Sequence, residues 1–369
     1  MKSLGKGGLF AIVLISGSFL GSSPFGRGGQ EAQDLVGRAN QAFGRLQRVM
    51  AAEKNPVTAG KVELGKILFY ETRISVDGTV SCSKCHPFSL YGADGLRTSV
   101  GNRCRTNPRN APTVLNAAGQ IAQHWVGNRV DVEDQARQSV VGPASFGMST
   151  PADVEKILKG IQGYAPLFKK AFPADADAVT VDSLAKAIGA FERTLVTPSP
   201  FDSFLAGQKD ALTGQQQSGL NAFLEAGCVT CHEGPYVGGR MYQKFGLLEP
   251  YWTYTKSEPV DEGRSAVTKT DADRYVFKVP GLRNVAKTAP YFHDGSVDDL
   301  ETAISIMGRV QLGQSLPPEK LRDIKAFLTS LTGKIPDDAL RLPLLPAKDE
   351  AMEPPRRQRW AGELVTAGA

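Results

Sequence analysis

The sequence predicts a mainly helical protein of two domains, each built around one copy of a short cysteine–histidine motif. Three observations lead to this prediction. Apolar residues recur at intervals of three and four, as they do on one face of a helix. The motif occurs twice, 146 residues apart, so each half of the chain has its own copy. The 369 residues suit two domains, joined by loops to which 39 Gly and 23 Pro contribute.

The first 23 residues have the pattern of an export signal peptide. Lys2 and Lys6 make a positive start, residues 9–20 are apolar, and small residues follow. The apolar run is short for a transmembrane helix, although an uncleaved N-terminal anchor is the alternative. We therefore expect an exported protein, with residues 28–34 as a polar connector to the first helices.

The first domain is expected over residues 24–198. An apolar helix over residues 64–69 precedes the first motif, and a capping box at residues 150–153 opens a second helix, with Pro at its first position. An apolar stripe over residues 184–195 predicts a third helix that ends before a proline. Residues 197–204 are then expected to cross between the domains.

The second domain is expected over residues 199–345. A helix capped by Thr213 and Gln216 leads to Gly227, directly before the second motif, so the unit of helix, turn and motif occurs twice. A late helix is expected from about Pro317 to Gly333. Residues 346–369 form a Pro-rich tail.

The repeated motif is Cys-x-x-Cys-His, the attachment pattern of c-type haem. In that pattern two cysteines form thioethers to the porphyrin and the histidine ligates the iron. A zinc site or a pair of disulfides is the alternative, but adjacent histidine in both copies is not zinc-finger spacing and disulfides do not need it. We therefore expect two covalent haem c groups, whose attachment residues and iron ligands are Cys82, Cys85, His86, Cys228, Cys231 and His232.

The rest of the composition sets limits on the function. The fifth cysteine, Cys104, has no partner for a disulfide. A net charge of +5 without blocks of Lys or Arg argues against a nucleic-acid partner. Because the thioethers of c-type haem are made outside the cytoplasm in bacteria, haem and export signal together predict a periplasmic protein.

From residue 64 to residue 346 the chain resembles the bacterial di-haem cytochrome c peroxidases, the family that also contains the MauG-type enzymes. The resemblance rests on long strings in a fixed order: Leu68-Phe-Tyr-Glu-Thr-Arg-Ile-Ser, Pro108-Arg-Asn-Ala-Pro-Thr-Val-Leu-Asn, Ala190-Phe-Glu-Arg-Thr-Leu, Val279-Pro-Gly-Leu-Arg-Asn-Val, Thr288-Ala-Pro-Tyr-Phe-His-Asp-Gly and Met307-x-x-x-Gln-Leu-Gly. It implies two cytochrome c-like domains, with a low-potential haem on His86 that reacts with the substrate. The haem on His232 would be the high-potential entry point for electrons.

The resemblance also implies roles for further residues. Met307 would be the distal ligand of the second haem, and Trp125 would lie between the two haems. Asn110, Thr288 and Pro290 match positions that hold a calcium ion between the domains, a cation that prefers oxygen ligands. The implied partners are hydrogen peroxide and a small cytochrome c or cupredoxin as electron donor, and family members are commonly homodimers.

The sequence departs from the family at the reacting haem. Family members carry a distal histidine sixteen residues after the first motif, where this chain has Asn102. Gln135 matches a distal glutamine, but the position of the catalytic glutamate falls at Ser145 or Phe146. Peroxide cleavage needs a group that moves a proton, and losing one typically costs about 10²–10⁴-fold in rate.

Three functions follow from these observations. The first is a periplasmic peroxidase with an atypical distal site, in which Gln135, Trp125 and Asn102 are the candidate catalytic residues. The second is a di-haem oxidase that acts on a protein or an organic substrate, as MauG-type relatives do. The third is a non-enzymatic cytochrome that transfers electrons or senses redox state.

Overall fold

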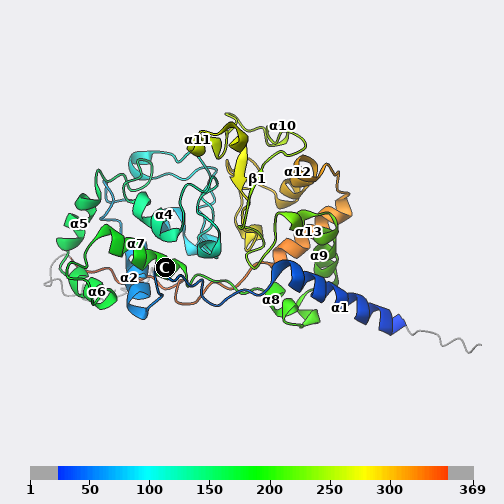
Figure 1. Ribbon diagram of the computed structural model, residues 1–369, viewed down its shortest axis with the longest axis horizontal. Coiled ribbons are helices and arrows are strands. Elements are labelled where there is room, and N and C mark those ends of the chain that lie inside the picture. The colour runs from blue at the N-terminus through cyan, green and yellow to red at the C-terminus, as the bar shows by residue number, and fades with distance from the viewer. Residues whose placement is uncertain (1–23, 348–369) are drawn as a thin grey trace, which may run out of the picture.

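A computed structural model describes residues 24–347 as two helical lobes side by side (Figure 1). The predicted signal at residues 1–23, and the tail from residue 348 onward, lie outside the described residues. In residues 24–347 no helix is both long enough and apolar enough to span a membrane.

The first lobe contains the helices that the sequence predicted around the first motif. Thr150 and Asp153 form the predicted capping box, in which each side chain accepts a hydrogen bond from the other residue's backbone N–H. The helices of this lobe are α2 (Ala59–Phe69), α3 (Cys82–Cys85), α4 (Val132–Ser139), α5 (Pro151–Lys159), α6 (Tyr164–Ala171) and α7 (Val181–Glu192).

The second lobe is also mainly helical and adds one small sheet. The capping box of Thr213 and Gln216 opens the helix before the second motif, as predicted. The helices are α8 (Pro200–Leu205), α9 (Gly214–Glu225), α10 (Trp252–Thr255), α11 (Ser265–Thr268), α12 (Leu300–Leu312) and α13 (Pro318–Ser330). The strands β1 (Tyr242–Lys244) and β2 (Val276–Lys278) pair antiparallel, with Tyr242 opposite Lys278.

The predicted repeat of helix, turn and motif is present in both lobes, and the same kind of helix crossing occurs in each. In each lobe the helix before the motif crosses a later helix at a glycine: α2 crosses α7 at Gly65, and α9 crosses α13 at Gly219. A Cβ on Gly65 would lie 1.9 Å from the Ala187 carbonyl oxygen, and one on Gly219 would lie 1.8 Å from that of Asp323. Only glycine permits such close approach, so these crossings fix each helix over its motif.

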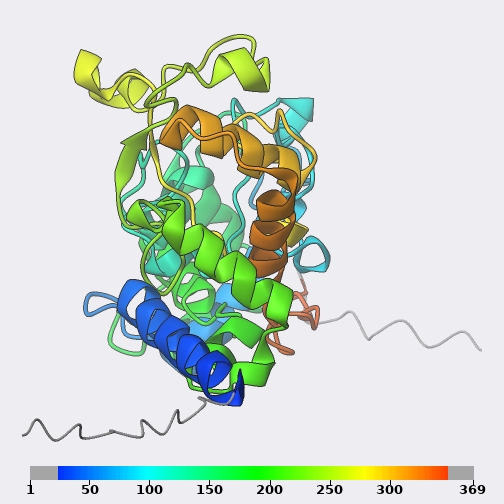
Figure 2. The ribbon, with the colours of Figure 1, turned by 90° about the vertical axis from the view of Figure 1, so that its right-hand side faces the viewer.

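Each end of the described chain packs against the lobe that is farther from it in the sequence. Helix α1 (Pro24–Phe43) precedes the first lobe in the chain, where the sequence placed it. It packs instead into the core of the second lobe through Leu35, Ala39 and Phe43, alongside α8 and α9 (Figure 2). In return, Ile335 and Ala339 pack into the core of the first lobe. An amphipathic stripe shows that a helix needs an apolar surface, but not which of two cores supplies it.

One expectation about connectors was wrong, and a second, the crossing between the domains, was right in place but too long, since Leu195 packs into the first core and Phe201 into the second. Residues 28–34 belong to α1, because helix propensity is a weak prior that tertiary packing of the following turns overrides. The expected crossing at residues 197–204 is helical from Pro200 onward, where a capping box of Ser199 and Asp202 starts α8. Phe201 and Phe204 on this helix are fully buried in the second core.

A buried ion pair fixes α4 against α7 and leads to a stability prediction. Glu133 accepts hydrogen bonds from Arg193 (2.8 and 2.9 Å) and from Asn55 (2.8 Å). We expect Arg193→Leu to lower the free energy of unfolding by about 3–5 kcal/mol, because it leaves a buried carboxylate without its charge partner. Urea unfolding of the holoprotein at neutral pH measures this loss.

The matched control is Arg137→Leu. Arg137 pairs with Asp182 at 2.6 Å, but 36% and 51% of the two side chains are exposed. Exposed pairs contribute about 0–1 kcal/mol, so this variant should unfold almost as the parent does. Equal losses in the two variants would contradict the role assigned to the buried pair.

Candidate functional site

Two cavities each contain one copy of the motif. The first cavity has an empty volume of about 1620 Å³, including its open mouth, and is lined by Cys82, Cys85 and His86. The second has about 1640 Å³ and is lined by Cys228, Cys231 and His232. The structure thus brings each predicted attachment pair together with its predicted iron ligand.

The first motif forms one helical turn, α3, that directs the histidine into its cavity. The backbone N–H of His86 donates to the Cys82 carbonyl at 3.0 Å, which closes the turn. Nδ1 of His86 lies 3.0 Å from the Gly92 carbonyl oxygen, an acceptor, so Nδ1 carries the proton and Nε2 keeps its lone pair. Burial lowers the pKa of His86, which also favours the neutral ring that a metal needs.

The second motif presents its histidine beside the predicted distal ligand. Gly227, in the left-handed conformation with φ 90°, turns the chain from α9 into the motif. His232 is buried, and burial lowers its pKa to about 4. Met307 on α12 lines the same cavity. A neutral imidazole and a thioether facing one cavity are a suitable ligand pair for haem iron.

Each cavity also contains a buried cationic group without an anion. Nζ of Lys278 on the wall of the second cavity bonds to the Gln120 amide oxygen, and burial lowers the pKa of Lys278 to about 8. Nε of Arg129 on the first cavity is buried without a partner. Within residues 24–347 the hydrogen bonds of these two side chains go to the Gln120 amide oxygen and the Asn128 carbonyl, and to no carboxylate. Buried cations need counter-charges, and the propionates of haem would supply them, so these residues fit the group.

Trp125 lies on the wall that the two cavities share. It lines both of them, as do Asn110 and the three residues after it. The indole N–H of Trp125 donates to the Asn110 carbonyl oxygen at 2.9 Å, which fixes the ring in place. This placement suits an aromatic group between two redox centres.

Of the remaining residues predicted to lie at the distal side of the first haem, three line the first cavity and one, Asn102, bonds to the loop behind it. Gln135 on α4 lines the cavity and donates from Nε2 to the Ser139 hydroxyl at 2.9 Å. Ser145 and Phe146 also line it, and neither transfers protons near neutral pH. Asn102 does not line the cavity: its amide donates to the carbonyls of Pro143 (2.7 Å) and Ser145 (2.9 Å). Asn102 therefore holds the loop that carries Ser145.

His124 also lines the first cavity, and no sequence motif indicated its role. It occupies the left-handed region with φ 64°, in a loop closed by the bridge between Gln123 and Arg129. Such a conformation is costly for a residue other than glycine and is concentrated at functional sites. Nδ1 lies 2.9 Å from Oδ1 of Asn128, which only accepts, so Nε2 is the basic nitrogen. Burial lowers the pKa of His124 to about 4, so it is neutral at physiological pH.

One carboxyl group lines the first cavity. Glu192, at the end of α7, is 4% exposed, and burial raises its pKa to about 8, with a further contribution from the charge of Glu133. It is therefore protonated at neutral pH. Apart from the expected haem-binding residues, His124 and Glu192 are the two side chains of this cavity whose pKa values lie between about 4 and 8.

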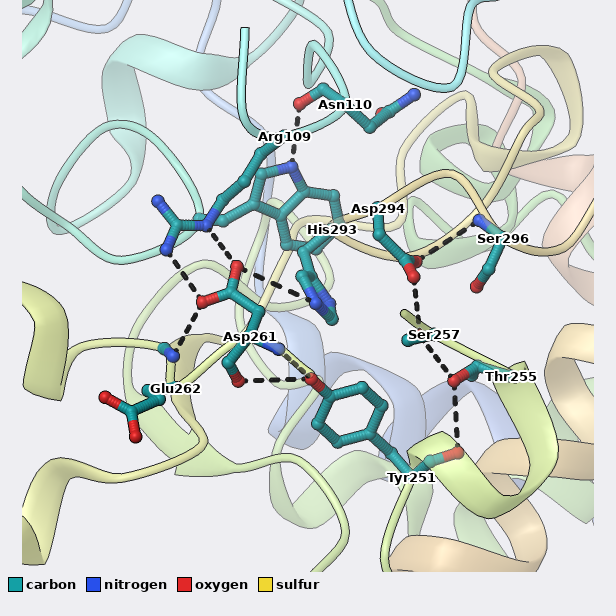
Figure 3. Close-up of polar contacts among 12 residues, drawn as sticks. Arg109, Asn110, Tyr251, Thr255, Ser257, Asp261, Glu262, His293, Asp294 and Ser296 are labelled. Atoms are coloured by element: carbon teal, nitrogen blue, oxygen red, sulfur yellow. Dashed lines mark hydrogen bonds and ion pairs between the residues drawn. The ribbon is translucent and has the colours of Figure 1, made fainter. Parts of the chain in front are cut away.

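A polar cluster around His293 supports the wall of the second cavity (Figure 3). Asp261 makes two hydrogen bonds with Arg109, at 2.7 and 2.9 Å, and its carboxylate lies 3.8 Å from Nε2 of His293. The hydroxyl of Tyr251 donates to the Asp261 carbonyl at 3.1 Å. These bonds connect the loop before α11 to the segment that precedes α4.

The three predicted calcium positions all belong to the lining of the second cavity. Asn110, Thr288 and Pro290 all line it. The amide nitrogen of Asn110 donates to the Leu96 carbonyl at 2.8 Å, so its side-chain oxygen remains available as a ligand. Over the described residues no group of three or more acidic, cysteine or histidine side chains could hold a metal. A calcium site here would therefore depend on amide and carbonyl oxygens.

Comparison with known proteins agrees with this geometry. Residues 59–210 match the family described as di-haem cytochrome c peroxidase. The chain is 45% identical to the cytochrome c551 peroxidase of Pseudomonas aeruginosa over 88% of this chain and 93% of that protein. It is 44% identical to the cytochrome c551 peroxidase of Nitrosomonas europaea over 83% of this chain and 88% of that protein.

A solved structure is similar in fold as well. A MauG-like protein associated with microbial copper homeostasis superposes with a TM-score of 0.71, at 28% identity, over 81% of this chain and 97% of that one. The two cavities, their motifs and the shared wall thus occur in a chain whose relatives at 45% identity are peroxidases. The chain belongs to the di-haem cytochrome c peroxidase family.

Proposed function

We propose that the chain is a periplasmic peroxidase that reduces hydrogen peroxide to water with electrons from a small cytochrome c or cupredoxin. The observation that carries this proposal is the pair of motif-bearing cavities with Trp125 on their common wall. The first cavity is lined by His86, the expected iron ligand, and by His124 and Gln135, which would supply the proton transfer and hydrogen bonding of a reacting site. The other pairs His232 with Met307, as an electron-transfer site requires.

Haem bound to the motifs would supply the redox chemistry, and the side chains of the first cavity would supply proton transfer and orientation. We assign His124 the role of the missing glutamate. Its Nε2 accepts a proton from hydrogen peroxide and returns it to the departing oxygen, which leaves as water. Asn128 holds the tautomer that makes this possible. Gln135, which lines the cavity, would donate its second amide hydrogen to bound peroxide while the first bonds to Ser139.

The side-chain contacts of Asn102 support a reacting site that needs no reductive activation. Its amide is engaged by the loop at residues 143–145, so Asn102 is not a distal ligand. The one histidine besides His86 that lines the cavity is His124, and we assign its Nε2 to proton transfer and not to the iron. We therefore expect the first haem to keep an open position when fully oxidised.

The test is steady-state consumption of hydrogen peroxide by the holoprotein, with a reduced small cytochrome c as donor. Fully oxidised and half-reduced enzyme are compared. Turnover from the oxidised form supports the proposal in full, and turnover from the half-reduced form alone places an unseen ligand at the first iron. If neither form turns over, the oxidase or electron-transfer function takes its place, and a covalent product on a co-expressed partner then distinguishes those two.

Calcium is the second part of the proposal, and it leads to a prediction. Side-chain and backbone oxygens of Asn110, Thr288 and Pro290 would bind the ion where the two lobes meet. Removing calcium with a chelator is expected to slow electron transfer between the haems, because the Asn110 carbonyl also positions Trp125. Stopped-flow reduction of the first haem through the second measures the rate. A rate that is unchanged in metal-free protein, with no calcium found by elemental analysis, contradicts the assignment.

A further inference from the structure

A continuous line of aromatic rings runs from the shared cavity wall to the surface near α10. The ring centroids of Trp125 and His293 lie 6.4 Å apart, and those of His293 and Tyr251 lie 5.3 Å apart. From Tyr251 the line continues to Trp252 at 5.2 Å, and from Trp252 to Tyr275 at 4.8 Å. Figure 3 shows two rings of the line, Tyr251 and His293, on either side of Asp261, whose backbone bonds to the Tyr251 hydroxyl.

We propose that this line conducts one-electron oxidising equivalents outward, and that Trp252 and Tyr275 form a second oxidation site for small electron-rich aromatic reductants. The proposal rests on the proposed function, because the reaction with peroxide must supply the oxidising equivalents. Tryptophan and tyrosine are the side chains that lose an electron most readily, and four of the five rings in the line are of these two types.

The contacts along the line favour passage of an electron without loss of a proton inside the protein. The N–H of Trp125 donates to a carbonyl oxygen, which cannot take the proton away. The hydroxyl of Tyr251 likewise donates to the Asp261 carbonyl, and burial raises the pKa of Tyr251 above its ordinary value. The inner rings therefore relay the electron, and deprotonation has to occur at the outer end.

The outer end is where water reaches the rings. Trp252 and Tyr275 are half-buried, whereas Tyr251 is fully buried. The exposed Arg274 lies over the Tyr275 ring, with its guanidinium carbon 5.2 Å from the ring centroid. Neither ring belongs to the lining of the two cavities. A small phenol in solution can thus approach Tyr275 without entering a haem cavity.

The electrons and protons balance at this site. Each hydrogen peroxide takes two electrons and two protons to give two waters. Each electron passes inward from Tyr275 through Trp252 to Trp125, and each oxidised Tyr275 loses its phenolic proton to solvent. A phenol then returns one hydrogen atom to Tyr275, so two phenols become two phenoxyl radicals for each peroxide consumed.

The experiment uses the holoenzyme with guaiacol as the phenol, and compares the parent with the double variant Trp252→Phe, Tyr275→Phe. We expect guaiacol oxidation to fall by about tenfold or more, while turnover with reduced cytochrome c stays within about twofold of the parent. The matched control is Tyr254→Phe. Tyr254 is on α10 beside Trp252, but no ring contact joins it to the line in the described part of the chain.

A second readout is independent of turnover. After peroxide without any donor, peptide mass spectrometry should find oxidised Trp252 and Tyr275 in the parent and an unmodified Tyr254. Cytochrome turnover with unchanged guaiacol oxidation in the double variant, or without oxidation at these two residues in the parent, overturns the inference and leaves the peroxidase function standing. Absence of peroxide consumption with either donor overturns both.

Discussion

Replacing His124 with glutamine is expected to lower kcat/KM for hydrogen peroxide by about 10²–10⁴-fold, the usual contribution of a general acid–base group. Glutamine preserves the polarity of the site but cannot take up a proton. The loss follows from the cavity itself, because its loop offers Ser145 and Phe146 in place of a carboxylate. Steady-state kinetics with reduced cytochrome c measures the change.

The pH profile gives a second test of His124. Because burial lowers its pKa to about 4, its basic form is present at neutral pH and is lost as the pH falls through 4. The parent should therefore lose kcat/KM on the acid side near pH 4, and the variant should not show that step. The lowered pKa of His124 also makes the stability of the fold depend on pH. The unfolded chain binds this proton near pH 6.5, so the free energy of unfolding decreases as the pH falls from about 6.5 to 4.

Glu192→Gln is the matched control, because it removes the other proton-exchanging group of the same cavity. Glu192 is already protonated at neutral pH, with a pKa near 8, so an amide changes little there. We expect this variant to retain most of its turnover at pH 7. If it loses the activity while His124→Gln retains it, Glu192 is the proton carrier and the assignment of His124 is wrong.

The features that the sequence predicted well are those set by neighbouring residues. The capping boxes at Thr150 and Thr213 each depend on a side chain three residues away, and both formed. The haem motifs are equally local, since attachment and ligation are contained in five consecutive residues. The geometry of such features is set by residues close in sequence and does not depend on contacts with distant parts of the chain.

The features that escaped prediction depend on contacts between distant segments. His124 faces the first cavity because a bridge from Gln123 to Arg129 holds its loop in a left-handed conformation, and no local pattern signals that bridge. The aromatic line joins Tyr251 and Trp252 to Tyr275 and His293, residues that are far apart in the chain. Helix α1 likewise packs into the second core through contacts with segments that are distant in the chain. Sequence order does not determine which surfaces meet.

Replacing Met307 with histidine is expected to lower the reduction potential of the second haem by roughly 0.2 V, within the ~0.8 V that axial ligands span. A thioether favours the reduced iron, whereas a second imidazole favours the oxidised iron. Met307 is on α12 and lines the cavity that contains His232, the expected ligand on the other side of the iron. Because electrons would enter through this haem, reduction by the cytochrome donor should slow as the potential falls.

A spectroelectrochemical titration of both haems measures the shift, and Met148→His is the matched control. Met148 packs against the first core and lines neither cavity, so its replacement should leave both potentials near those of the parent. Met307→Leu adds a spectroscopic test, since losing the thioether should abolish the charge-transfer band of methionine-ligated ferric haem. An unchanged potential in Met307→His, or a persistent band in Met307→Leu, would assign the distal position to another residue. In either case electron entry would need a different explanation from the His232–Met307 pair.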